Sequence, residues 1–419
     1  MLKRKSTPTF VLLLLLAGLT YFLLKLPSPP PLVSAADFST SRAEVLETDD
    51  SSVDTHGFVE YGTQRLKVRL PDGRIVSAEN ELRAQLDYDK KFKKGDTALV
   101  ILPSNLSLNS MPDGPLVARD YWRLGWVGVL FAAFAVFLVA FAGWTGVGAL
   151  FTFFFSCLVV WKLLVPSVLS GYNPVLVSFV VVSVLTAVII FLVAGFNKKG
   201  LSAFIGAMLG SLASLALAGL FSSLMNINGG TMPSSQELLY SCPYIVSLRG
   251  IFTGAIILAS SGAVMDLAMD IASGVAEVKR HNSSLKFGEL FKSGCRMGRA
   301  VVGTMTTTLL LAYSGGYLTL LMVFAAEGVR PIDFLNSSVV SAEIVKTLVG
   351  SFGLVAVAPF TAFASAFLFS RENKAPPFGG WPRWWGQQLI GTPMAGKSAS
   401  LTFRLVLRAA QPITMSKMF

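Results

Sequence analysis

The sequence predicts an all-α polytopic membrane helix bundle with a small extracytoplasmic β-rich domain between its first and second spans. Composition is the first reason, since 53% of the 419 residues are hydrophobic and 14% are charged, with a mean hydropathy of +0.61. A soluble fold cannot bury that much apolar surface, whereas lipid can cover it. The second reason is that the hydrophobic residues gather into separate runs, most of them long enough to cross a bilayer.

The net charge of +11 is unevenly distributed along the chain. More than half of the acidic residues lie within residues 35–118, so the rest of the chain is strongly basic. Basic residues in the short loops of a membrane protein set its orientation. The sequence contains no recognisable nucleic-acid module. We therefore expect the lipid bilayer, and no nucleic acid, as the partner of these basic residues.

The N-terminal segment, residues 1–34, carries an apolar run from Phe10 to Leu24 that follows three basic residues. This arrangement fits a retained membrane anchor. It also fits a signal peptide, because Val33-Ser34-Ala35 resembles a cleavage site with small residues. The retained anchor is the favoured interpretation, and under either one the following residues lie outside the cytoplasm.

Residues 35–118 are expected to form the extracytoplasmic β-rich domain, with a barrel-like shape. Polar and apolar residues alternate over Gln64–Leu70, and a Pro-Asp-Gly turn follows, so a β-hairpin is predicted there. A second turn leads into a strand over Ala98–Leu102. Ala78–Tyr88 is expected to be a short helix or a loop, and the basic run Lys90–Lys94 a solvated loop.

Residues 119–371 are expected to form a seven-span bundle. With the anchor the chain has about eight spans, or seven plus a cleaved signal, and both termini are cytoplasmic. The positive-inside rule supports this orientation, because the basic loops at Lys198–Lys199 and Lys279–Arg299 then lie inside. Residues 372–419 form a basic cytoplasmic tail, either interfacial or disordered. The seven predicted spans are Leu124–Phe141, Val147–Leu169, Val175–Phe196, Leu201–Met225, Ile251–Ile271, Val301–Ala325 and Thr347–Phe369.

Small residues recur at four-residue spacing in two of these spans and predict close helix packing. The span at Leu201–Met225 contains Gly206 and Gly210 in such a ladder. In the span at Ile251–Ile271, Gly254 and Gly262 share a ladder with two carboxylates, Asp266 and Asp270. We therefore expect both carboxylates to face other helices rather than lipid.

Asp266 is the main candidate functional residue. It lies fifteen residues after Ile251, or about 22 Å along a helix, which is inside a hydrocarbon layer about 30 Å thick. A carboxylate at that depth is costly unless it faces protein or water, so a functional role is favoured. Asp270 lies near the boundary of the layer, where a structural role at headgroup level and a functional role fit equally well.

The next span runs antiparallel, and the threonines near its start match Asp266 in depth. Threonines in membrane helices commonly bond back to their own backbone, and we expect this of most of them. One or two that face Asp266 would form a polar pocket, with an arginine as counter-charge at its mouth. The candidate pathway residues beyond the two carboxylates are Thr304, Thr307, Thr308, Tyr313 and Arg299.

At these residues the chain resembles the YibE/F-like family of bacterial multi-pass membrane proteins. The matching stretches are Gly262–Met269, Gly303–Met305, Leu309–Tyr313, Ala342–Ile344 and Gly350–Val355. The resemblance implies an N-terminal anchor, an extracytoplasmic domain and a multi-span bundle in the bacterial plasma membrane, and it implies no established activity. The chain departs from the family pattern at Asp270, where a serine is usual, and at Ala300, where an aspartate is common.

Transport of an ion or small solute, with Asp266 as an intramembrane carboxylate, is the favoured function. It rests on the buried acid, the matched threonines and a last span that Pro359 is expected to kink or break. The alternative is a non-transporting sensor or scaffold that acts through the extracytoplasmic domain, with a second copy or a related membrane protein as partner. An enzyme is not expected, and neither is a metal or cofactor, because no nucleophile and base or histidine cluster is evident.

Overall fold

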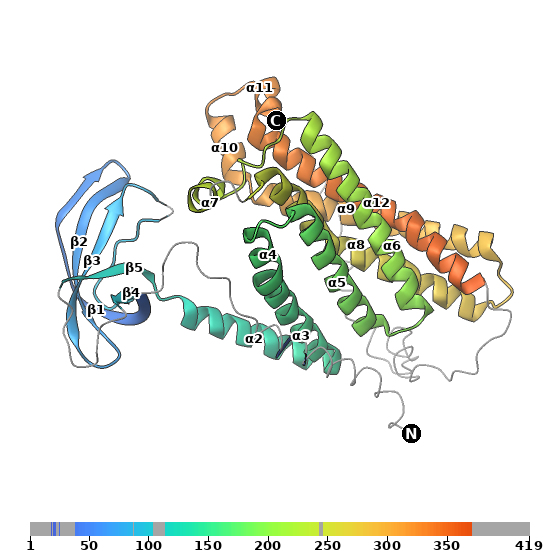
Figure 1. The fold of residues 1–419 in the computed structure, drawn as a ribbon, viewed down its shortest axis with the longest axis horizontal. Coiled ribbons are helices and arrows are strands. Elements are labelled where there is room, and N and C mark those ends of the chain that lie inside the picture. Colours follow the sequence, from blue (N-terminus) through green and yellow to red (C-terminus); the bar gives the residue numbers. More distant parts are fainter. Residues whose placement is uncertain are drawn as a thin grey trace, which may run out of the picture. The chain divides into compact units, whose positions relative to one another are not determined.

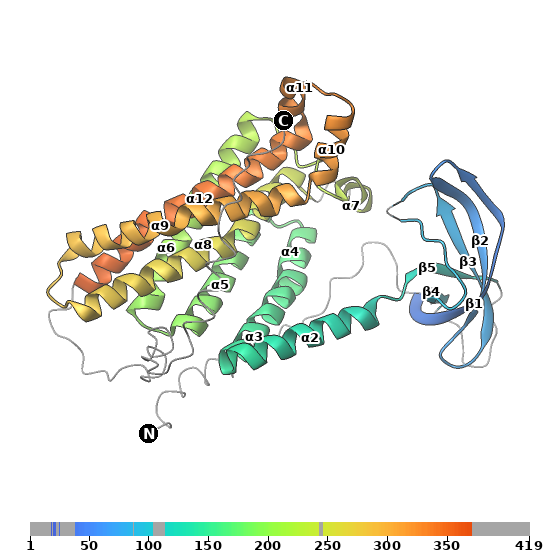
Figure 2. The same ribbon diagram turned by 180° about the vertical axis from the view of Figure 1, so that it is seen from behind.

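The computed structural model describes residues 38–86, 88–103, 114–242 and 246–370, together with four isolated positions before residue 38. Figures 1 and 2 show a β domain followed along the chain by a helical region. Most of the expected N-terminal anchor or signal lies outside the described residues, and so does the expected tail at residues 372–419.

The β domain is a closed five-stranded barrel, which confirms the prediction of a β-rich, barrel-like domain. The strands follow the order β1-β2-β3-β5-β4, with β3 and β5 parallel and the other neighbours antiparallel. This order is that of the OB-fold, which carries binding sites in many proteins but does not itself establish a function. The strands are β1 (Phe38–His56), β2 (Val59–Arg69), β3 (Ile75–Arg83), β4 (Thr97–Pro103) and β5 (Leu116–Tyr121).

The predicted hairpin is confirmed, since β2 and β3 pair up to a turn at Gly73. The φ of +88° at this residue lies in the region that favours glycine. The helix or loop expected over Ala78–Tyr88 is wrong in its first half, because β3 continues to Arg83. Even-numbered residues of β3 are buried in strict alternation, as a strand requires. One of these buried residues is Asn80. Because asparagine is polar, the hydropathy pattern of the sequence does not show that the strand continues through this position.

A buried glutamine connects the basic run Lys90–Lys94 to the barrel through hydrogen bonds. The side chain of Gln64 is fully buried and exchanges two hydrogen bonds with the backbone of Phe92, at 2.8 and 2.9 Å. Lys91 donates a hydrogen bond of 2.8 Å to Glu60, and this bond raises the pKa of the Lys91 ammonium. The expected solvated loop is therefore wrong in part, because only the last two lysines of the run are exposed.

The helical region contains six described helices that are long and apolar enough to cross a membrane, or seven if the bent pair α9 and α10 is one span. A multi-pass membrane protein is therefore indicated. Around the core, α12 contacts α6, α8 and α9, and α8 also contacts α5. The elements are α2 (Leu124–Ala142), α3 (Trp144–Val159), the π-helical turn η1 (Val160–Leu164), α4 (Val165–Leu169), α5 (Pro174–Ala194), α6 (Lys198–Leu224), α7 (Ser235–Ser241), α8 (Leu248–His281), α9 (Phe287–Gly315), α10 (Leu318–Ala326), α11 (Pro331–Asn336) and α12 (Ser338–Ser370).

Two of the predicted spans differ in form from the observed helices. The span expected at Val301–Ala325 begins earlier, at Phe287, and is interrupted after Gly315 by a bend of 65° into α10. A pair of adjacent glycines, Gly315 and Gly316, marks this bend. Of the kink or break expected at Pro359 in the last span, the break is wrong, because α12 runs unbroken for 33 residues with Pro359 inside it.

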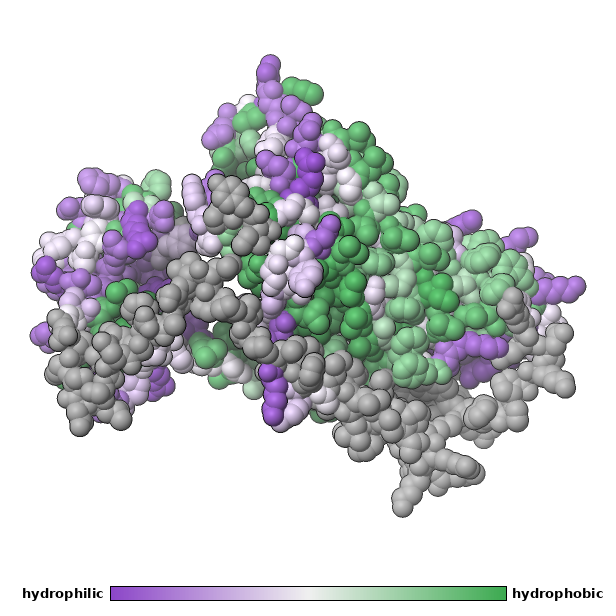
Figure 3. Space-filling model, in the orientation of Figure 1, coloured by the Kyte–Doolittle hydropathy of each residue, from purple (hydrophilic) through white to green (hydrophobic). Residues whose placement is uncertain are grey.

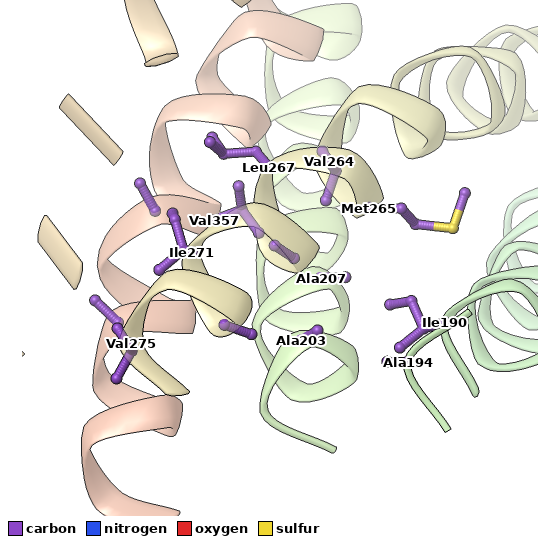
Figure 4. Close-up of a cluster of buried hydrophobic side chains, with 14 of the residues drawn as sticks. Ile190, Ala194, Ala203, Ala207, Val264, Met265, Leu267, Ile271, Val275 and Val357 are labelled. Carbon is purple, nitrogen blue, oxygen red and sulfur yellow. The ribbon is translucent and has the colours of Figure 1, made fainter. Parts of the chain in front are cut away.

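The core of the bundle depends on the close approach of α6 and α12. A Cβ atom added to Gly206 would overlap the Thr361 side chain, and one added to Gly210 would lie 2.9 Å from the Cβ of Val357. The buried hydrophobic side chains of α5, α6, α8 and α12 meet beside this contact (Figure 4). The ladder of small residues in α6 is therefore a contact surface for α12.

The outer surface of the helices is largely apolar. Figure 3 shows hydrophobic residues over much of the helical region, whereas hydrophilic residues gather on the β domain. The helix α2 buries none of its residues, although large apolar side chains such as Trp126, Phe137 and Phe141 lie along it. Lipid can cover a surface of this kind, in agreement with a membrane location.

Gly206→Val should destabilise the bundle by about 1–3 kcal/mol or more, because the new side chain would push α6 and α12 apart. Thermal unfolding of the purified protein in detergent measures this effect. Gly219→Val is the matched control, since Gly219 lies in the same helix with no atom within 4 Å of its Cβ position. Equal loss of stability in the two variants would contradict the packing role of Gly206.

Candidate functional site

Asp266 lies near the middle of α8, 18 residues after Leu248 and 15 residues before His281. Its neighbours on both sides along the helix, Met265 and Leu267, are buried in the core. The carboxylate itself is exposed, and so is that of Asp270 one turn later. The two acids therefore lie on one edge of the buried face of α8.

Both carboxylates line one pocket of about 340 Å³ between α5, α8 and α9. Its volume is at the lower end of the range for small-molecule sites. The apolar walls come from α5 and from methionines of α8 and α9, and Figure 4 shows the side chains of Met265 and Ile190 on the same side of α8. The lining residues are Ile189, Ile190, Val193, Met265, Asp266, Met269, Asp270 and Met305.

Among the residues that the structure describes, none donates a hydrogen bond or forms an ion pair with Asp266 or Asp270. Lys199, at the start of α6, is near enough for a Coulomb interaction with Asp270. A carboxylate without a partner in a membrane-spanning helix is costly, by about 2.5–3.5 kcal/mol at the centre of a helix. The pocket therefore holds negative charge that a ligand can neutralise.

The other candidate pathway residues lie outside this pocket lining. The hydroxyls of Thr304, Thr307 and Thr308 are exposed, and each donates to a backbone carbonyl three or four residues earlier in α9, at 2.9–3.0 Å. Arg299 is exposed and forms no ion pair with a described carboxylate. From α9, Met305 alone is among the lining residues.

The glycines expected at helix contacts have different surroundings. A Cβ on Gly254 would overlap Ser178 of α5, so α8 and α5 approach closely at that point. Gly262 is exposed and has open space at its Cβ position. The face that carries these small residues therefore contacts α5 at Gly254 but no longer contacts a helix at Gly262. The two carboxylates that follow on this face lie at the pocket.

The sequence model of the YibE/F-like protein family matches residues 130–371. The chain belongs to the YibE/F-like family. No curated protein and no solved structure matches it. The family region includes all residues of the pocket and ends at the last residue of the expected bundle, whereas the barrel precedes it.

The family region of the chain contains a second polar cluster, at the bend between α9 and α10. Glu343 and Lys346 of α12 form an ion pair of 2.6 Å, with only 17% and 20% of their side chains exposed. Lys346 also donates to the Tyr317 hydroxyl at 3.4 Å. The second carboxylate oxygen of Glu343 and the hydroxyl of Tyr313 are buried without a partner among the described residues. Tyr313 thus belongs to this cluster rather than to the Asp266 pocket.

Reasoning from polarity misses the three methionines of the pocket. A signal for two of them is present, because residues 265–270 read Met-Asp-Leu-Ala-Met-Asp, so a Met-Asp pair repeats at four-residue spacing. On a helix this spacing brings the two methionines onto one stripe and the two aspartates onto the adjoining stripe. No group of three His, Cys, Asp or Glu residues in the described chain is placed to hold a metal ion.

Proposed function

We propose that this member of the YibE/F-like family moves a cation or a small solute across the bacterial plasma membrane, with Asp266 as the binding carboxylate. The observation that carries the proposal is the pocket at the middle of a membrane-length helix, lined by two unpartnered carboxylates. Ionisable groups inside membrane helices are rare and are typical of ion and proton pathways.

The bend between α9 and α10 gives this proposal further support. Discontinuous helices expose backbone carbonyls and helix ends, and they are common at the binding sites of transporters. Here the bend lies beside the partly buried pair Glu343 and Lys346, with Tyr317 in the bend itself. The bundle therefore has polar groups at the bend as well as at Asp266.

The topology belongs to the same proposal. Both chain termini lie in the cytoplasm, and the barrel lies outside it. The support for this is the charge of the loops. Lys198 and Lys199 begin α6, and Lys279 and Arg280 end α8, so these basic helix ends lie on the same side of the membrane if α6 and α8 are antiparallel spans. The bilayer is then the main partner, with a second copy or a related membrane protein as a further one.

Asp266→Asn should abolish transport while preserving the fold, because the amide has nearly the same size and no charge. Proteoliposomes that contain the full chain and a pH-sensitive dye are exposed in turn to gradients of Na⁺, K⁺ and Ag⁺. We expect a dye response to at least one gradient in the wild type, and a response equal to that of empty liposomes in the variant.

Asp333→Asn is the matched control, because Asp333 is exposed on α11 and pairs with Arg330 at 2.7 Å, away from the pocket. This variant should transport like the wild type. Unchanged flux in Asp266→Asn would remove this carboxylate from the mechanism. A wild type without a dye response under every gradient would argue against proton-coupled transport of these cations.

A second candidate function, sensing or scaffolding through the barrel, has its own supporting observation. The side chains of Phe58 and Leu86 are 84% and 71% exposed and line a pocket of about 300 Å³ on the barrel. Exposed aromatic and aliphatic side chains around a pocket are typical of interaction sites. A partner that binds there would use the bundle as a membrane anchor.

A photo-crosslinking residue in place of Phe58 tests this second function in living cells. If the barrel pocket binds a partner, a discrete adduct should form that mass spectrometry can identify. The control is the same substitution at Ile75, which is 51% exposed on β3 and does not line the pocket. The same adducts from both positions, or none from either, would contradict a partner at Phe58.

A further inference from the structure

Three methionine thioethers and two carboxylates line one pocket, and they come from two different helices. Met265 and Met269 lie one turn apart on α8, and Met305 belongs to α9. The protein has 13 methionines in 419 residues, so three among eight lining residues is a concentration that calls for a physical reason. Gap filling is one use of methionine, and Met265 does belong to the hydrophobic core, with Met269 and Met305 packed against it. The same three residues also border the open volume of the pocket, which gap filling does not require.

The donor atoms of the pocket select among cations. Na⁺, K⁺ and Mg²⁺ prefer oxygen ligands, and apart from Asp266 and Asp270 the lining side chains offer none. Thioethers are soft ligands that favour Cu(I) and related ions. A hard cation that left water for this pocket would replace most of its hydration shell with sulfur and hydrocarbon, whereas a soft cation gains ligands.

Charge points to the same class of ligand. Asp266 has no partner among the described residues, and one monovalent cation would neutralise it. Asp270 forms no ion pair with a described residue either, but Lys199 at the start of α6 is near enough for a Coulomb interaction with it, which balances part of its charge. Methionine has three rotatable side-chain bonds, so the thioethers of the two helices can converge on an ion inside the pocket volume of about 340 Å³.

We propose that Met265, Met269, Met305 and Asp266 form a binding site for a soft monovalent metal ion, Cu(I) or Ag(I). The thioethers supply the ligands and the carboxylate supplies the compensating charge. This inference rests on the pocket of the proposed function and names the class of its substrate. The ion is the cargo of the site and needs no further cofactor.

Binding of Ag(I) to the full chain in detergent tests the proposal, because Ag(I) is a redox-stable ion of the same class. Titration calorimetry in a chloride-free nitrate buffer gives the number of ions bound and their affinity. All variants carry alanine at the native thiols Cys157, Cys242 and Cys295, since thiols would bind Ag(I) by themselves. In this background we expect one Ag(I) per chain at the pocket.

Met→Leu substitutions are the decisive variants, because leucine keeps the volume and removes the sulfur. Met265→Leu combined with Met269→Leu and Met305→Leu should eliminate the bound Ag(I), and each single change should weaken binding by at least about tenfold. Met208→Leu with Met322→Leu, on α6 and α10 and outside the pocket lining, is the control and should bind Ag(I) like the parent.

Three results would overturn the proposal. The first is that the parent binds no Ag(I), and the second is that the triple variant binds it as tightly as the control. Binding of tetraphenylphosphonium that depends on Asp266 but not on the methionines would also overturn it, since the pocket would then serve organic cations. Failure of transport is a separate outcome, because Ag(I) binding without flux would refute the proposed function and leave this site intact.

Discussion

The contact between α6 and α12 is the constraint on which the bundle depends. Gly206 and Gly210 of α6 lie against Thr361 and Val357 of α12 so closely that neither glycine has space for a Cβ atom. Lipid provides no hydrophobic force between helices, so such contacts hold a membrane bundle together through dispersion and close fit. The same kind of close contact occurs between α9 and α12, where a Cβ atom added to Gly298 would lie 2.7 Å from the Cβ of Ala358. Helix α12 is thereby fixed to α6 and α9, with α8 packed against the same group.

This packing gives α8 two different sides. Its core side carries residues such as Val264, Leu267 and Ile271, which are almost completely buried against neighbouring helices. Its other side faces α5 and α9, and the pocket with Asp266 lies between the close contacts that Gly254 makes with α5 and Gly274 makes with α9. A carboxylate at that position is compatible with a folded bundle because the pocket, and not the packed core, surrounds it. The site is thus a consequence of where close packing ends.

Sequence reasoning recovers the parts of this structure that depend on local pattern. Long apolar runs predict the helices, and the turn at Gly73 predicts the hairpin, because both signals are contained in a few neighbouring residues. The early start of α9 at Phe287 is missed because its first turns carry polar residues. The composition of the pocket is missed because it joins α5 with α8 and α9, and hydropathy cannot tell which apolar side chains meet there. From the sequence alone a methionine is interpreted as a core residue, and only the structure shows that these methionines line a pocket together with two carboxylates.

We infer that Asp266 lines a site that solutes reach from water. Asp266→Cys in a background without native thiols, treated in membranes with a charged methanethiosulfonate reagent, tests this claim directly. Such reagents react with thiolates, which form only where water has access. We expect this thiol to be modified, and the rate of modification should fall when Met269→Trp fills the neighbouring volume. Complete resistance at residue 266, with ready labelling of a cysteine at Ser283 in the exposed loop after α8, would contradict it.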